Sequence, residues 1–99
     1  MAADLIVSPE AEEDLDAAYS WYEDRQVGLG ERFLLSVDSC MQSICDSPES
    51  YPSVRKRFRR AIVPRFPFSV FYEYADRVVK VHCVFHSARD PRKWRSRLP

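Results

Sequence analysis

Glycine is almost absent from this sequence. Only Gly28 and Gly30 occur among the 99 residues, and both fall in one short turn. A phosphate-binding loop needs several glycines between a strand and a helix, so that backbone amides can approach the ligand closely. The chain has no such loop, and this excludes nucleotide-fold chemistry. The sequence also lacks internal repeats and low-complexity tracts.

Cysteine and histidine are equally sparse. The three cysteines, Cys40, Cys45 and Cys83, form no CxxC pair, and their odd number and spacing favour buried thiols over a disulfide or a metal site. The two histidines, His82 and His86, lie four positions apart on a predicted strand, a separation of about 13 Å at roughly 3.3 Å per residue. One zinc ion cannot bind both. We expect no metal and no other cofactor.

Long apolar runs are missing as well. No uninterrupted apolar stretch approaches the roughly 20 residues of a membrane span. The opening MAADLIVSP lacks the basic and apolar segments of a signal peptide, so we expect a cytoplasmic protein that uses no membrane. With 45% hydrophobic and 13% aromatic residues, the chain has enough apolar mass for one core, and residues 1–99 should form a single domain.

Charge is balanced overall but unevenly distributed along the chain. Residues 1–50 contain twelve acids and two bases, a net charge of −10, whereas residues 51–99 contain three acids and thirteen bases, a net charge of +10. A basic half that also carries the predicted sheet suggests a face for nucleic acid or for an acidic protein segment. The alternative is that acidic helices lie beside basic strands and compensate them within the molecule.

The N-terminal half predicts a helical hairpin. After a short strand candidate at residues 4–8, Ser8 is a suitable N-cap and Pro9 a suitable first helical residue. Apolar residues at helical spacing then extend to about Arg25. A second apolar stripe follows the break at residues 26–30 and runs to about Asp46. The short break predicts that the two helices lie side by side.

The C-terminal half predicts strands and one short helix. Residues 54–74 favour two strands separated around Pro64 and Pro67, because proline is excluded from a continuous central strand. A tight turn at 75–77 leads into a strand over 78–86, which completes an antiparallel hairpin. Asp90 can cap a final helix over 91–97. We predict an α+β fold in the order β-α-α-β-β-β-α, a small antiparallel sheet with the helical hairpin on one face.

The strand over 78–86 has two unequal faces, and we expect function at its C-terminal end. This strand should lie inside the sheet, with its apolar face on the helices and its mixed face open to water or a partner. Alternation places Val79, Val81, Cys83 and Phe85 on the apolar face, and Val78, Lys80, His82, Val84 and His86 on the mixed face.

Four segments of the chain carry a resemblance to a known family. They are SPEAEEDLDAAYSWY, GERFLLSVDSCMQSICDSP, FRRAIVPRFPFSVFYEY and the closing VFHSARDPRKW, which is similar to a family motif His-x-x-Arg-Asp-Pro-x-x-Trp. In this order they resemble the ParE/RelE superfamily of toxins from bacterial toxin-antitoxin pairs, most closely its ParE-like branch. The resemblance covers nearly the whole chain. The resemblance implies the predicted fold. It also implies that an antitoxin segment wraps over the toxin in a hetero-oligomer and neutralises it.

What the resemblance implies about activity spans two mechanisms. ParE-like members inhibit DNA gyrase, and RelE-like members cleave messenger RNA on the ribosome. The closing PRKWRSRLP has neither the tyrosine nor the histidine that often completes the nuclease site. We therefore expect a plasmid-stabilisation toxin that inhibits gyrase and is not an enzyme. A metal-independent, ribosome-dependent endoribonuclease is the first alternative, and a degenerate domain that only binds its antitoxin is the second.

RNA cleavage and binding to a partner would each use a different set of residues. Metal-free RNA cleavage needs an acid, a base and cations for the phosphate charge. The candidates for those roles are His86, Arg89, Arg60 and Arg65. We expect an antitoxin or a target to bind at the basic run over residues 55–60, at the mixed face with its two exposed apolar anchors, and at the closing segment. The predicted binding residues are Arg55, Lys56, Arg57, Arg59, Arg60, Phe71, His82, Val84, Arg89 and Trp94, of which Phe71 and Val84 are the anchors.

Structural roles compete with these functional ones. His86 can cap the sheet edge through a backbone hydrogen bond, and Arg89 can pair locally with Asp90. Trp94 on a short terminal helix can fill a gap in the core. The basic run at 55–60 can be a solvated strand edge that prevents aggregation.

Overall fold

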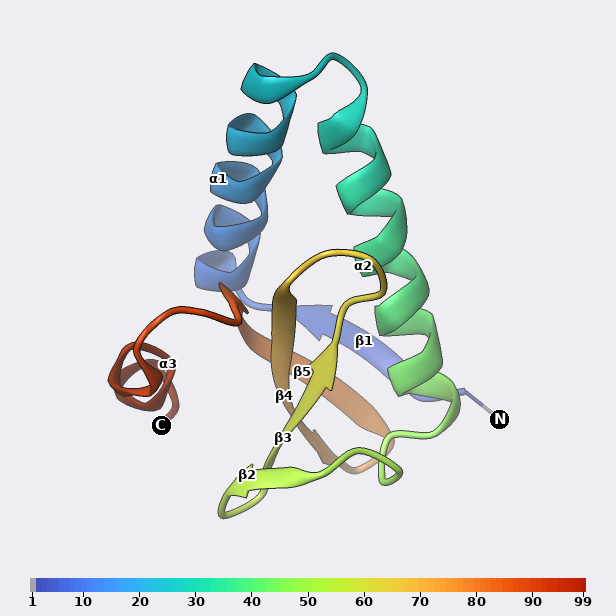
Figure 1. Ribbon diagram of the computed structural model, residues 1–99. Helices are drawn as coiled ribbons and strands as arrows, with labels where there is room; N and C mark the ends of the chain where they lie inside the picture. Colours follow the sequence, from blue (N-terminus) through green and yellow to red (C-terminus); the bar gives the residue numbers. More distant parts are fainter. Residues whose placement is uncertain (1) are drawn as a thin grey trace.

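The computed structural model describes residues 2–99 (Figure 1). The helices lie where the sequence predicts them, and the sheet contains one strand more than predicted. The segment predicted as a single strand from residue 54 turns back on itself at Lys56, whose backbone is left-handed with φ 51°. The elements are β1 (Asp4–Val7), α1 (Pro9–Arg25), α2 (Leu29–Asp46), β2 (Ser53–Arg55), β3 (Phe58–Ile62), β4 (Phe68–Ala75), β5 (Val78–His86) and α3 (Pro91–Arg97).

The α1–α2 hairpin is set by its caps and its turn. Ser8 Oγ accepts a hydrogen bond from the Ala11 amide at 3.0 Å, as expected of an N-cap. At the other end, the Glu23 carboxylate accepts from the amides of Gly28 and Gly30 at 2.9 and 3.0 Å. Gly28 has φ 87°, and a Cβ on Gly30 would lie 2.8 Å from the Tyr19 ring. Both glycines are therefore required where the sequence has them.

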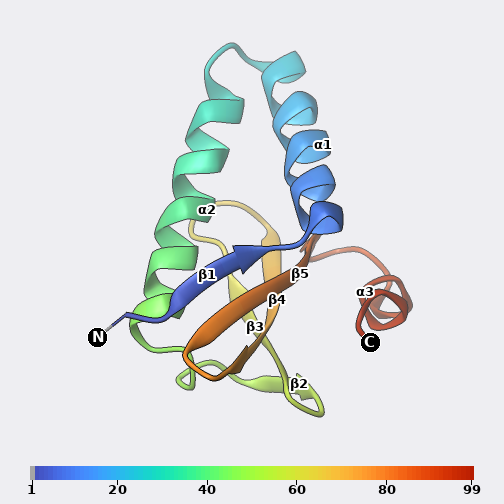
Figure 2. The same ribbon diagram turned by 180° about the vertical axis from the view of Figure 1, so that it is seen from behind.

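The sheet has the order β1-β5-β4-β3-β2 and is mixed. Four neighbouring strands pair antiparallel, but β1 runs parallel to β5 (Figure 2). The prediction of a purely antiparallel sheet is therefore wrong at one edge. A local pattern cannot reveal this pairing, because the two strands are separated by most of the chain. The prediction that 78–86 lies inside the sheet is confirmed.

A β-bulge in β5 changes which residues face the helices. Phe71 pairs with Cys83, but the next residue, Tyr72, pairs with Val81, so His82 is the extra residue. Beyond the bulge the alternation is inverted, and Val84 packs toward the helical hairpin while Cys83 joins the other face. The predicted faces are right up to His82, which packs on Phe58 of the second face, and wrong after it, because strict alternation assumes an unbroken ladder.

The molecule has a core on each side of the sheet. The larger lies between the sheet and the α1–α2 hairpin. The smaller lies under α3, where Trp94 stacks on Phe71 with ring centroids 4.6 Å apart. The expectation that this second face is open is therefore wrong. The three cysteines are free and buried, as predicted, and burial raises the pKa of Cys83 to about 12.

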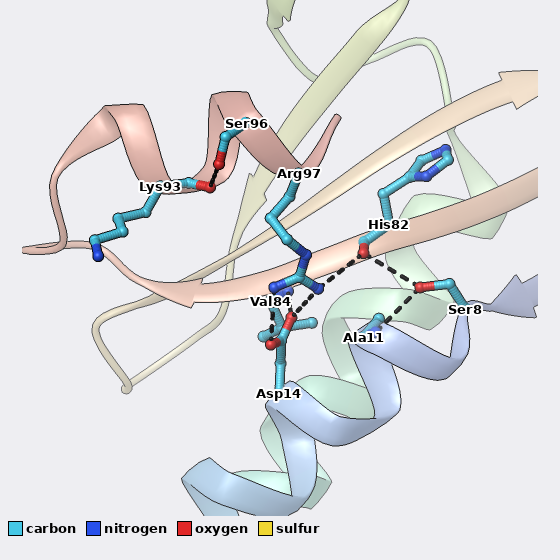
Figure 3. A network of polar contacts seen from close by, with 8 residues as sticks. All are labelled: Ser8, Ala11, Asp14, His82, Val84, Lys93, Ser96 and Arg97. Carbon is cyan, nitrogen blue, oxygen red and sulfur yellow. Dashed lines mark hydrogen bonds and ion pairs between the residues drawn. The ribbon is translucent and has the colours of Figure 1, made fainter. Parts of the chain in front are cut away.

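Side chains complete the edge of β5 where β1 ends (Figure 3). The β1 ladder stops at Val81. Beyond it, Ser8 Oγ donates to the His82 carbonyl at 3.2 Å, and the Val84 amide donates to Asp14 Oδ2 at 3.0 Å. Arg97 from α3 also donates to the Asp14 carboxylate, at 3.0 and 3.2 Å. One carboxylate on α1 thus fixes both the sheet edge and the terminal helix.

Removing this carboxylate should loosen α3. Asp14→Ala leaves the Val84 amide and the Arg97 guanidinium without their partner, at a cost of about 2 kcal/mol. Urea unfolding measures the loss, and alkylation of Cys83 in native conditions should become faster because α3 covers it. Asp16→Ala is the matched control on the same helix, since Asp16 is exposed and should change stability by less than about 0.5 kcal/mol. Equal effects of the two substitutions would contradict this role for Asp14.

Candidate functional site

Two depressions meet at the C-terminal end of β5, the place where the sequence predicts function. His86 and Arg89 line both of them. The apolar cleft, of about 430 Å³, lies between α1 and the sheet. The basic pocket, of about 230 Å³, lies between the sheet and α3. The apolar cleft is lined by Asp14, Ala17, Ala18, Trp21, Tyr22, Phe68, Val84, His86 and Arg89.

The apolar cleft has an aromatic rim. Trp21 keeps 51% of its surface exposed although it lies beside the buried Tyr22. The Arg25 guanidinium sits 3.2 Å above the Trp21 ring centroid, which holds the indole in place. An exposed tryptophan over an apolar depression is a feature of binding surfaces. The sequence carried a signal for it, because Trp21 falls outside the predicted apolar stripe of its helix.

The basic pocket gathers residues from both ends of the C-terminal half. Arg60 comes from β3, Ser69 from β4, Arg89 from the loop after β5 and Arg95 from α3. Within the described residues no carboxylate lines it. The lining is completed by Phe71, Phe85, His86, Ser87, Pro91 and Trp94.

The ring of His86 has a structural role in this arrangement. Its Nδ1 accepts a hydrogen bond from the Ala88 amide at 3.0 Å, and the ring packs edge-on against Phe68 at 5.3 Å. A neutral imidazole whose Nδ1 accepts carries its proton on Nε2. His86 therefore fixes the turn after β5, which is the structural alternative that the sequence left open.

Arg65 does not join the other ribonuclease candidates. Arg60, His86 and Arg89 line the basic pocket, but Arg65 lines a separate depression with Arg32 and Phe66. Its backbone is left-handed, with φ 68°, in the turn between β3 and β4. Three of the four predicted residues are thus brought together and one is not.

Most of the basic run at 55–60 is held by the protein itself. Arg55 donates to the Arg95 carbonyl at 3.1 Å, and Arg59 donates to the Tyr51 carbonyl at 2.6 Å. Arg57 forms an ion pair with Glu73 at 2.7 Å. Among residues 2–99, Lys56 and Arg60 have no side-chain hydrogen bond or ion pair. The run therefore has a largely structural role at the edge of the sheet, and Arg60 is its residue that lines the basic pocket.

His82 belongs to a small polar network rather than to an open face. Its Nε2 lies 2.7 Å from Glu73 Oε1, and its ring packs edge-on against Phe58 at 5.2 Å. Partial burial raises the pKa of the Glu73 carboxyl, but the hydrogen bonds from Arg57 and His82 outweigh it, so the pKa is lowered overall. His82 is 9% exposed, and the expectation that it is accessible is wrong.

The predicted apolar anchors are buried as well. Phe71 is 2% and Val84 1% exposed, so the expectation that they stand free on an open face is wrong. The bulge turns Val84 to the helical side, and α3 covers Phe71. Phe71 instead lines the basic pocket together with Trp94, and Val84 lines the apolar cleft. Trp94 fills the core under α3, which is the structural role that the sequence left open for this residue.

Internal compensation accounts for little of the charge asymmetry. Four ion pairs occur within residues 2–99, and only Asp14–Arg97 joins the acidic half to the basic half. Arg57 and His82 both pair with Glu73, and Arg92 pairs with Asp90, all inside the basic half. Most charges of the two halves are therefore not neutralised by ion pairs within the described residues. No helix within the described residues is long and apolar enough to cross a membrane.

Two solved structures share this fold. A chain described as "Chromosomal ParDE TA system from P. aeruginosa" matches with a TM-score of 0.73 and 18% identity, over 86% of this chain and 96% of that chain. The isolated E. coli RelE toxin matches with a TM-score of 0.62 and 17% identity, over 96% of this chain and 95% of that chain. No curated protein gives a sequence match.

These likenesses define the class as the ParE/RelE toxin fold, which confirms the predicted fold class. The sequence gives a finer assignment, because residues 5–91 match the family described as "ParE toxin of type II toxin-antitoxin system, parDE". The chain belongs to this ParE toxin family.

Glu73 should make stability depend on pH in the acid range. Because its folded pKa is lowered from 4.5, the carboxylate stabilises the folded state above the unfolded pKa, and this contribution is lost as pH falls through the folded pKa. The unfolding free energy of the wild type should exceed that of Glu73→Gln at neutral pH, and the difference should shrink as pH drops below 4.5. Urea unfolding over a pH series measures it. A difference that stays constant with pH would refute the assignment.

Proposed function

We propose that this chain is the toxin of a type II pair and that it inhibits DNA gyrase by binding, in the cytoplasm, without being an enzyme. The family match over residues 5–91 is the observation that carries the proposal. The lining of the basic pocket, within the described residues, has one imidazole and no carboxylate, and this supports the proposal because RNA cleavage needs both an acid and a base.

An antitoxin partner fits the apolar cleft. The relative from P. aeruginosa is described as a toxin-antitoxin system. An amphipathic segment can place apolar side chains between Trp21 and Phe68, and acidic side chains toward Arg89 at the junction with the basic pocket. This moves the expected antitoxin contact from the open sheet face to the cleft beside α1, because α3 covers that face.

The ribosome-dependent ribonuclease remains the second candidate function. Its support is the convergence of Arg60, His86 and Arg89 on one pocket. A domain that only binds its antitoxin is the third. The assays below distinguish all three.

Substitution of His86 by alanine should leave toxicity largely intact. A catalytic histidine typically contributes 10²–10⁴-fold in rate, whereas the loss of one turn-capping hydrogen bond affects stability only. The measurement is ATP-dependent supercoiling by purified gyrase at increasing toxin concentration, set beside primer extension on ribosome-bound messages. Unimpaired supercoiling with message cuts that vanish in His86→Ala would promote the ribonuclease. Silence in both assays would favour the domain that only binds antitoxin.

Filling the apolar cleft should block the antitoxin. Ala17 is an exposed small residue that lines the cleft, so Ala17→Arg places a long charged side chain where apolar groups of the partner should pack. Affinity for the antitoxin should fall about 100-fold or more, equivalent to about 3 kcal/mol. Isothermal titration with the antitoxin measures it. Ser20→Arg is the control, because Ser20 is exposed on the same helix but does not line the cleft; equal losses from both would place the antitoxin elsewhere.

A further inference from the structure

We propose that the basic pocket binds a phosphate group of nucleic acid. Three arginines, Arg60, Arg89 and Arg95, line one depression of about 230 Å³. Three positive charges that share a small concave site repel one another, and a bound anion removes that repulsion.

None of the three arginines is committed to a protein carboxylate. Arg60 has no side-chain hydrogen bond or ion pair within residues 2–99. The Arg89 guanidinium lies over the Phe85 ring at 4.9 Å, and that of Arg95 lies over the Trp94 ring at 5.2 Å. Stacking on an aromatic face leaves the guanidinium donors in the ring plane free to bind.

Asp90, the acid that follows Arg89 in the chain, is also occupied. The Asp90 carboxylate accepts from the Arg92 side chain at 2.6 and 2.9 Å, and it does not line the pocket. Within the described residues, the three arginines of the pocket therefore form no ion pair, and no carboxylate lines the pocket with them.

Two serine hydroxyls provide neutral donors at the same place. Ser69 is 2% exposed, and its Oγ has only the Ser87 Oγ near it, at 3.5 Å. Good hydroxyl hydrogen bonds measure about 2.5–3.0 Å, so this contact is weak and both hydroxyls keep their capacity to donate. A buried polar group with a poor partner at a pocket wall indicates a site for a ligand oxygen.

The sheet register sets this arrangement. Arg60 pairs with Phe71, and Ser69 pairs with Phe85, so these four side chains share the face that α3 partly covers. The pocket is thus preorganised on β3, β4 and β5, with Arg95 added by α3. A rigid scaffold lowers the entropy cost of binding.

The geometry favours phosphate over carboxylate. A carboxylate has two oxygens in one plane and is satisfied by one guanidinium fork, whereas a phosphate presents oxygens in several directions. Donors here come from three separate elements and the loop after β5. The apolar wall of Phe71, Pro91 and Trp94 suits the sugar beside a phosphodiester. We therefore assign a phosphodiester group as the ligand, and the DNA held by gyrase as the source of that group. Only the choice of source rests on the proposed function.

Binding can be measured on the free protein with Trp94 as reporter. In a Trp21→Phe background Trp94 is the only tryptophan and lines the pocket. Titration with inorganic phosphate, and separately with short single-stranded DNA, should give a saturable emission change, with the DNA tighter. Arg60→Gln should weaken both about tenfold and lower the salt slope for DNA by about one. Ser69→Ala should weaken both without a change in charge.

Arg65→Gln is the matched control, since it removes the same charge from another depression and should leave binding unchanged. No response to phosphate or DNA, or equal weakening by Arg60→Gln and Arg65→Gln, would overturn the proposal. Binding of an acidic antitoxin peptide alone at this pocket would overturn it in favour of a protein carboxylate.

A gyrase assay tests the source of the phosphate separately. Arg60→Gln should require about tenfold more toxin than Arg65→Gln to inhibit supercoiling. If the wild type binds phosphate and DNA but does not inhibit gyrase, the proposed target fails and the phosphate site stands. If both variants inhibit equally while phosphate binding differs, the DNA of gyrase is not the ligand.

Discussion

The edge of β5 is the constraint on which the rest of the structure depends. β1 is too short to pair with all of β5, so backbone groups beyond Val81 need other partners. Ser8 and Asp14 supply them from the start of α1, and Asp14 also holds Arg97. This one edge therefore orients the helical hairpin on one face of the sheet and α3 on the other. Both candidate binding depressions lie in the gaps that result.

The two depressions differ in what they can bind, although they share His86 and Arg89. The apolar cleft has an exposed tryptophan and suits an amphipathic protein segment, whereas the basic pocket has three arginines and suits an anion. Because the two are contiguous, an antitoxin that fills the first can also cover the second. The antitoxin and the anionic ligand would then compete at the rim that the two depressions share, rather than for one identical site. This is a simple physical basis for neutralisation.

Local chemistry explains which elements could be predicted from the sequence. Ser8 and Asp90 are caps and Pro9 and Pro91 are first helical residues, so the starts of α1 and α3 follow from adjacent residues. The bulge at His82 and the parallel pairing of β1 depend on contacts far apart in sequence, and no local pattern signals them. The burial of Phe71 depends on α3; Trp94 indicated that this helix could pack on a core, but not that it covers the second face of the sheet. The convergence of Arg60 and Arg89 was predicted, but the separation of Arg65 depends on the β3–β4 turn.

The central claim is that this toxin acts by binding and not by turnover. The most direct measurement is the stoichiometry and reversibility of gyrase inhibition in a purified system. Binding predicts that inhibition saturates at a fixed ratio of toxin to gyrase, stays constant with time, and is reversed when the antitoxin is added afterwards. Inhibition that continues to grow at substoichiometric toxin, or that the antitoxin cannot reverse, would contradict the claim.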